Sequence, residues 1–213
     1  MCNMGVDNLT LIDPPDFNIE KVKKTATHES SRIVENIKIV KTIEEAIEQS
    51  NYLVGTTARL GRQRQVIISP SQMASKTIPL SHKNNISLLF GPEDKGLSNH
   101  EIKYCDCLVN IPTIKFTSIN LSQAVMILCY EISKGVVPST SEKAIRLAGK
   151  KELEKMYQYL ERVFVESDYT NPENPEFYLL KFRKFFSGLK LKSGEVIILN
   201  NLLKKILIKF SKK

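Results

Sequence analysis

One stretch, residues 86–134, constrains the fold of this 213-residue chain more than any other. It reads as an apolar strand, a loop with two glycines, a short helix, a second strand, a polar loop and a long helix; the two strands are 86–90 and 107–111, and the two loops are 91–97 and 113–118. Apolar runs that stop at Gly-Pro or Pro are typical of buried parallel strands. Two loops at the carboxyl ends of such strands, one opening into a helix, predict a binding site for a small polar ligand.

Helix-start signals support these boundaries. Ser98 and Glu101 have the spacing of a capping box and predict a short helix after the glycine loop. A longer helix is expected to begin at Ser118 or Asn120, because the apolar residues that follow recur at helical spacing, namely Leu121, Ala124, Val125, Leu128 and Ile132. The amino end of this helix therefore lies beside the glycine loop.

The glycine loop can be interpreted in three ways, as a phosphate loop, as a dinucleotide-binding loop or as a plain turn. Gly91 and Gly96 have the spacing of a Walker-type phosphate loop, but Leu97 stands where that loop needs a lysine. A dinucleotide fingerprint needs three glycines at one helix entrance, and they are absent here. The remaining structural interpretation is a plain strand-to-helix turn with two flexible residues.

The first half of the chain alternates strands with helices. Strands are expected at 6–12, 37–40 and 52–55, and helices from Asn18, from Thr42 to Gln49 and from Ser69-Pro70. This alternation predicts an α/β fold with a parallel sheet covered by helices.

Positive charge is concentrated in the last third of the chain. Residues 1–142 contain 15 Lys/Arg and 15 Asp/Glu, whereas 143–213 contain 16 and 8. A linker is expected at 134–141, followed by three helices whose apolar stripes form a core; the stripes are Leu153, Met156, Tyr157, Leu160, Val163 and Phe164, then Phe177, Leu180 and Phe185, then, after a Ser193 cap, Val196, Leu199, Leu203, Ile206 and Phe210. The lysines outside these stripes indicate an anionic partner, with a merely solvated face as the alternative.

Composition excludes several classes of protein. No apolar run has the length of a membrane span, and the amino terminus lacks a signal-peptide pattern, so we expect a soluble, cytoplasmic protein. The four cysteines and three histidines lack metal-site or secreted-framework spacing, so we expect reduced cysteines and no metal.

Longer motifs carry a resemblance to a known family. The run Phe90-Gly91-Pro92-Glu93-Asp94-Lys95-Gly96-Leu97, then Ile111-Pro112, then Thr117-Ser118-Ile119-Asn120-Leu121-Ser122-Gln123-Ala124, is similar to the carboxy-terminal motifs of the SPOUT RNA methyltransferases. Within that class the chain resembles the tRNA cytidine/uridine 2′-O-methyltransferases of the TrmJ type, from about residue 4 to about residue 210. The resemblance implies a SPOUT domain at 1–134 with a trefoil knot, S-adenosylmethionine as cofactor, a homodimer, and a basic RNA-binding extension at 135–213.

The same resemblance implies roles for individual residues. Cofactor-binding residues would be Thr56, Thr57, Ala58, Gly91, Ile111, Thr117, Ser118 and Ile119. Ser118 and Asn120 would serve catalysis, with a helix cap as their alternative structural role. Contacts to RNA are expected from Arg59, Arg62, Arg64, Lys204 and Lys205.

The amino terminus departs from the family pattern. Asn3-Met4-Gly5 imitates a family segment that carries a catalytic arginine, but no arginine follows, and Met4-Gly5 aligns instead with the Met-Gly that closes the arginine helix. We therefore expect the sequence to lack the family's first strand and nearly all of that helix. Three hypotheses stay open: an active tRNA 2′-O-methyltransferase, a non-catalytic RNA-binding remnant, and an unrelated α/β enzyme that binds nucleotides at the Gly91 loop.

Overall fold

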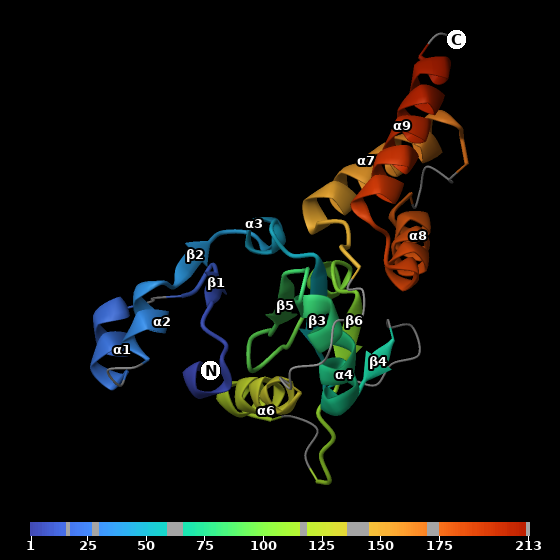
Figure 1. The fold of residues 1–213 in the computed structure, drawn as a ribbon. Helices are drawn as coiled ribbons and strands as arrows, with labels where there is room; N and C mark the ends of the chain where they lie inside the picture. The colour runs from blue at the N-terminus through green and yellow to red at the C-terminus, as the bar shows by residue number, and fades with distance from the viewer. Residues whose placement is uncertain are drawn as a thin grey trace.

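A four-stranded parallel sheet lies at the centre of the protein (Figure 1). The computed structural model describes residues 1–15, 18–26, 30–58, 66–115, 119–135, 145–169 and 175–211. In the sheet the strand order is β4-β6-β3-β5, and the strands span Tyr52–Thr56 (β3), Ile67–Ile68 (β4), Ile86–Leu89 (β5) and Cys107–Val109 (β6). The predicted α/β class and the parallel pairing are confirmed. The two-residue strand β4 was not expected, because so short a run carries no periodicity.

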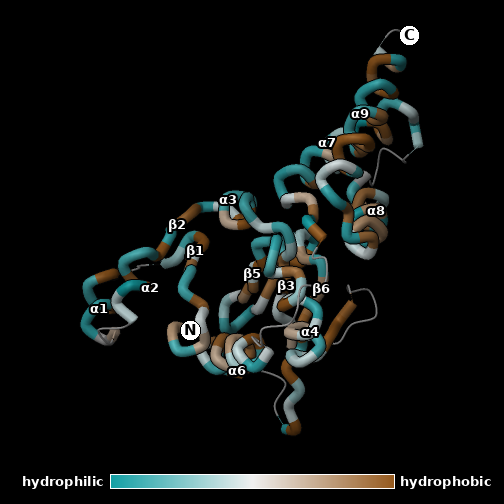
Figure 2. Tube along the Cα trace, viewed as in Figure 1, coloured by the Kyte–Doolittle hydropathy of each residue, from teal (hydrophilic) through white to brown (hydrophobic). Residues whose placement is uncertain are grey.

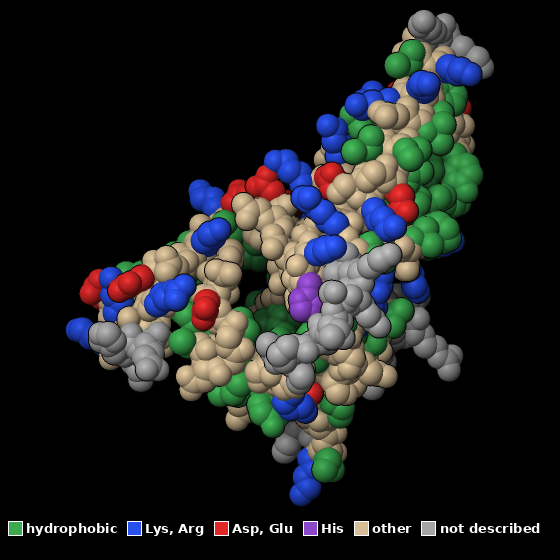
Figure 3. All heavy atoms as spheres, in the orientation of Figure 1, with side chains coloured by type: hydrophobic (Ala, Val, Ile, Leu, Met, Phe, Trp, Pro, Cys, Tyr) green, Lys and Arg blue, Asp and Glu red, His purple; other side chains and the backbone are tan. Residues whose placement is uncertain are grey.

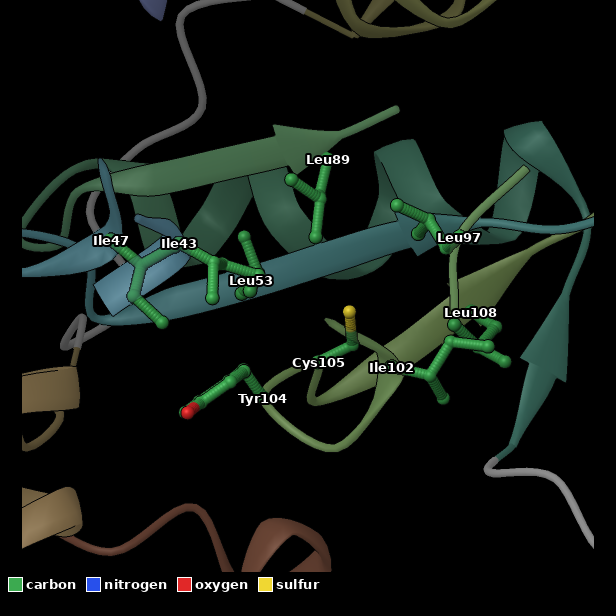
Figure 4. Packing of buried hydrophobic residues seen from close by; sticks show 9 residues of the cluster. All are labelled: Ile43, Ile47, Leu53, Leu89, Leu97, Ile102, Tyr104, Cys105 and Leu108. Atoms are coloured by element: carbon green, nitrogen blue, oxygen red, sulfur yellow. The ribbon is translucent and has the colours of Figure 1, made fainter. Parts of the chain in front are cut away.

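The sheet is buried on both faces because its side chains alternate. Leu53 and Leu108 point into one core cluster, together with Leu89, and their neighbours Tyr52 and Val54 point into the other. Figure 4 shows the first cluster, in which Ile43 and Ile47 of α3 (Ile43–Ile47) approach the sheet residues Leu53 and Leu89. Such two-sided burial explains why these strands read as continuous apolar runs.

Helices on each side complete the layers. The first cluster is closed by α3 and by α5 (Asn99–Ile102), whose Ser98 and Glu101 form the expected capping box. Against the second cluster pack α4 (Pro70–Ser81), which starts at the predicted Ser69 cap, and α6 (Leu121–Lys134). The long helix α6 begins directly after its N-cap Asn120, as expected.

The amino-terminal strands form a separate two-stranded parallel sheet. Its strands are β1 (Thr10–Ile12) and β2 (Lys38–Val40), joined by α1 (Ile19–Thr25) and α2 (Ser31–Glu35). Ile12 packs against the core cluster that contains Leu89. Ahead of this sheet, the turn η1 (Cys2–Met4) ends at Gly5, whose left-handed φ of 70° suits glycine, and η1 lies against α6.

Three helices form the carboxy-terminal part: α7 (Lys150–Glu166), α8 (Pro175–Leu189) and α9 (Ser193–Phe210). Their shared core contains all six predicted stripe residues of α7, and Val196, Leu199 and Leu203 of α9. The stripe predicted for α8 is wrong, because Phe177, Leu180 and Phe185 are half exposed and the inward residues are Tyr178, Leu179, Phe182 and Phe186. Hydropathy alternates along all three helices (Figure 2), and none of those in the described ranges is both long and apolar enough to span a membrane.

A polar joint fixes α7 to the sheet. The Lys150 ammonium lies 2.7 Å from the Asp106 carboxylate, and the same carboxylate oxygen accepts a hydrogen bond from the Leu53 amide at 2.7 Å. Both charged side chains are more than nine-tenths buried. Beside them, the Asn84 side chain donates to the Ile145 carbonyl and accepts from the Leu147 amide, at 2.8 and 2.7 Å. These contacts tie the three-helix part to the sheet.

Candidate active site

The site follows from the register of the sheet. Gly55 of β3 pairs with Leu89 of β5, and Thr56 pairs with Val109 of β6. The carboxyl ends of the three strands are therefore level, so the segments that follow them meet at one edge. Open parallel sheets bind ligands at this edge.

A pocket of about 530 Å³ lies where these segments meet. Its volume falls within the range of small-molecule sites, which is roughly 300–1,000 Å³. The end of β3 contributes Thr56, Thr57 and Ala58 to the lining, and every residue from Phe90, which follows β5, to Leu97 contributes as well. The remaining lining residues are Val109 of β6, Ile111 and Ile119 between β6 and α6, and Leu121 and Ala124 of α6. Apolar walls thus surround a few polar groups, as in a site for an organic ligand.

Two glycines shape the loop. At Gly91 a Cβ would lie 2.2 Å from the carbonyl carbon of Gly96 and 2.4 Å from the amide nitrogen of Leu97, so the loop folds back on itself at a distance that only glycine permits. Gly96 has a φ of 65°, and its amide donates to the Pro92 carbonyl at 2.8 Å. Leu97 is buried in the core beneath and anchors the loop. The two glycines are therefore required for the conformation of the loop itself, whether or not a ligand is bound.

One hydrogen bond ties the glycine loop to the start of α6. The Asn120 amide nitrogen donates to the Glu93 carboxylate at 2.9 Å, while its oxygen accepts from the Ser122 amide at 2.9 Å and from the Ser122 hydroxyl at 2.6 Å. Glu93 therefore braces the glycine loop against the start of α6.

This bonding pattern limits what Asn120 can do chemically. An amide side chain has two N–H donors and two acceptor sites on its oxygen. Within the described residues one donor goes to Glu93 and both acceptor sites go to Ser122. A carboxamide takes up no proton at neutral pH, so Asn120 has one N–H to offer a ligand and cannot act as a general base.

The structure brings six of the predicted site residues together and separates others. Thr56, Thr57, Ala58, Gly91, Ile111 and Ile119 all line the pocket. Thr117, Ser118, Arg59, Arg62 and Arg64 lie outside the described residues. Lys204 and Lys205 are exposed on α9, which extends away from the sheet (Figure 1). Sequence reasoning missed Leu121 and Ala124 as lining residues, although their i, i+3 spacing places both on one face of α6.

The three buried cysteines lack the properties of a nucleophile. Burial raises the pKa of the Cys105 thiol to about 12, and burial also raises the pKa values of Cys107 and Cys129. These thiols stay protonated at neutral pH and pack as small apolar groups. Across the described ranges, no group of three His, Cys, Asp or Glu side chains is placed to hold a metal ion.

The sequence matches a known family of proteins. Residues 1–130 match the SpoU rRNA Methylase family, and the chain belongs to that family. This membership overturns the hypothesis of an unrelated nucleotide-binding α/β enzyme. It also agrees with the resemblance that the Gly91 and Asn120 motifs indicate.

Particular relatives narrow the comparison. The chain is 30% identical to the tRNA (cytidine/uridine-2′-O-)-methyltransferase TrmJ of Sodalis glossinidius, over 97% of this chain and 83% of that protein. It is 32% identical to the tRNA (cytidine-2′-O-)-methyltransferase TrmJ of Methanocaldococcus jannaschii, over 88% and 85%. Among solved structures it is similar to TrmJ from Z. mobilis ZM4, with a TM-score of 0.82, 25% identity, and coverage of 96% of this chain and 88% of that one.

Proposed function

We propose that this protein transfers a methyl group from S-adenosylmethionine to a ribose 2′-hydroxyl of tRNA, at a cytidine or uridine of the anticodon loop. The observation that carries the proposal is the convergence of six motif residues on one pocket at the carboxyl ends of β3, β5 and β6. Relatives that are named as tRNA 2′-O-methyltransferases support the enzyme over a non-catalytic RNA-binding remnant.

The pocket suits S-adenosylmethionine, which supplies the methyl group as a sulfonium. Val109, Ile111 and Leu121 offer apolar walls for the adenine and the thioether carbons. Polar groups from Thr56 and the glycine loop surround the remainder. The Thr56 hydroxyl donates to the Leu89 carbonyl at 3.2 Å, which links the ends of two strands that would cradle the cofactor.

The residues of the chain contribute mainly by position. Methyl transfer to a hydroxyl needs the attacking oxygen in line with the bond that breaks, and alignment alone supplies much of the rate. The free N–H of Asn120 would donate to the ribose or to the cofactor, while Glu93 fixes the orientation of that amide. Ser118, which lies outside the described residues, stays a proposed catalytic residue.

The proposal predicts both binding of the cofactor and formation of a methylated product. Calorimetry on the folded protein is expected to show binding of S-adenosylmethionine and its homocysteine product. Incubation with unmodified tRNA is expected to yield a 2′-O-methylated nucleoside, detected by mass spectrometry after digestion. Binding of adenine nucleotides, with no binding of either sulfur compound, would refute the proposed cofactor.

A second prediction concerns the proposed RNA contacts of α9. Lys204, Lys205 and Lys209 are exposed, and each phosphate contact releases counterions. Replacing all three by glutamine is expected to weaken binding of every tRNA similarly and to reduce the log–log salt slope by about 2 to 3. The affinity for S-adenosylmethionine is expected to stay unchanged. Filter binding across a salt series measures both effects.

The matched control removes three positive charges at another place on the surface. Lys38, Lys41 and Lys83 are also exposed, and their replacement by glutamine should leave the salt slope nearly as it was. If the α9 variant kept the affinity and the slope of the parent, its lysines would be a solvated face. RNA contact would then have to come from Arg59, Arg62 and Arg64.

The same proposal includes a homodimer in the cytoplasm, with a trefoil knot in the SPOUT domain. Support for the dimer comes from α6, where Met126 and Tyr130 are half exposed on the helix whose amino end lines the pocket. A second copy that covers this helix would shield them from water and lie close to the site.

A further inference from the structure

Helix α9 carries more apolar residues than its own core uses. Val196, Leu203 and Leu207 face inward and are buried. Four further large apolar residues stay half or more exposed: Ile197 at 54%, Ile198 at 69%, Leu202 at 54% and Ile208 at 55%. A soluble helix normally shows one apolar stripe, and apolar residues all around a helix indicate further burial.

The exposed residues share one side of the helix. At 100° per residue, Ile197, Ile198, Leu202 and Ile208 fall on the side opposite Val196 and Leu203, together with Lys205 and Lys209. We call this side the outer face of α9. Figure 3 shows hydrophobic side chains gathered on the three-helix part of the molecule, with lysines and arginines beside them. An exposed apolar surface of this kind typically marks an interaction site.

The positive charge around the outer face indicates the chemistry of its partner. Residues 175–211, which contain α8 and α9, include eight Lys/Arg and two glutamates, Glu176 and Glu195. A second copy docked through the same face would add a second Lys205 and a second Lys209 to one contact, and like charges in one interface oppose association. A complementary surface therefore combines an apolar stripe with carboxylates.

RNA does not account for the apolar residues. Proteins contact RNA through cations at phosphates and through aromatic or guanidinium planes at bases. The outer face offers lysines for the first role, but its apolar residues are aliphatic and have no plane to stack on a base. Helix α8 differs from α9 because its exposed apolar residues include the aromatic ring of Phe177. Lys181 lies over that ring at 4.3 Å and covers part of its apolar surface.

We propose that the outer face of α9 docks an acidic amphipathic helix of a partner protein. The helix would lie along α9, whose 18 residues give a contact about 27 Å long, with its apolar stripe on Ile198 and Leu202 and its carboxylates near Lys205 and Lys209. This inference does not depend on the proposed methyl transfer, but Lys205 and Lys209 are shared with the proposed tRNA contacts, so the acidic helix and tRNA would compete for these two lysines.

The test uses the full chain and two synthetic peptides as long as α9. One is amphipathic with a leucine stripe and glutamates elsewhere, and its twin has lysines in place of the glutamates. Fluorescence anisotropy is expected to show binding of the acidic peptide and little binding of its twin. Ile198→Ser/Leu202→Ser should weaken the acidic peptide about tenfold or more, whereas Ile39→Ser, a residue with 56% exposure on β2, should not.

Three results would overturn the proposal. Equal binding of both peptides would show that charge does not determine which helix binds to the outer face. Loss of tRNA affinity in the Ile198→Ser/Leu202→Ser variant, with circular dichroism unchanged, would assign the face to RNA. A smaller particle mass for that variant in light scattering would assign the face to a second copy of this chain.

Discussion

Replacing Gly91 by valine is expected to lower the affinity for S-adenosylmethionine by about ten- to hundredfold, since forcing atoms into a packed site costs about 1–3 kcal/mol. The reason is local, because any Cβ at this position meets the backbone of Gly96 and Leu97 at 2.2 to 2.4 Å. The loop must open to relieve that clash, and the pocket wall moves with it. Calorimetry with cofactor and the folded variant measures the effect.

Two companion variants sharpen this experiment. Gly91→Ala adds only the Cβ and should already produce most of the loss if the clash is the cause. Gly188→Ala, in α8, places a methyl group where no atom lies within 4 Å, and its cofactor affinity should equal that of the parent. A Gly91→Ala protein with parental affinity would show that the close approach within the loop does not shape the site.

Replacing Lys150 by methionine is expected to lower the free energy of unfolding by about 3–5 kcal/mol, because it leaves a buried carboxylate without its counter-charge. Asp106 keeps one bond, from the Leu53 amide, but loses the ammonium at 2.7 Å. Urea unfolding followed by circular dichroism measures the change, and an unaltered m value would show that the unfolded state is the same.

A double variant and a variant of the neighbouring residue separate the effect of the lost charge from the effect of altered packing. Lys150→Met/Asp106→Asn removes both charges and keeps an acceptor for the Leu53 amide, so it should recover most of the loss. Lys151→Met breaks only the exposed pair with Glu48 and should leave the urea midpoint close to that of the parent. If the single variant at Lys150 were as stable as that control, the pair with Asp106 would not be what holds α7 to the sheet.

The elements that sequence reasoning predicted correctly are those with local signals. The caps at Ser69, Ser98 and Asn120 each start a helix where expected, because a cap is decided by residues within one turn. Ser193 is an exception: the N-cap of α9 is Lys192, and the Ser193 hydroxyl donates instead to Glu152 of α7 at 2.9 Å. A tertiary contact here overrides the local preference.

Features that depend on distant partners were not predictable. Helix α8 has aromatic or aliphatic residues on two sides, so periodicity alone could not tell that Tyr178 and Phe182 face inward while Phe177 and Phe185 do not. Lys150 reads as one lysine among many, and only the fold places it on Asp106. In the pocket, the motifs indicated Thr56 and Gly91, whereas the bond between Glu93 and Asn120 required the spacing of two loops.

The polar joint at Asn84, Asp106 and Lys150 bears on the choice of substrate. Because it ties the three helices to the sheet, it sets the separation between the proposed RNA contacts of α9 and the proposed methyl-transfer site. If both proposals hold, a long folded RNA would reach both places, and its second contact would form at high effective concentration. A short RNA that fills the pocket would reach only one of the two places, so the molecule would select substrates by length as well as by nucleotide.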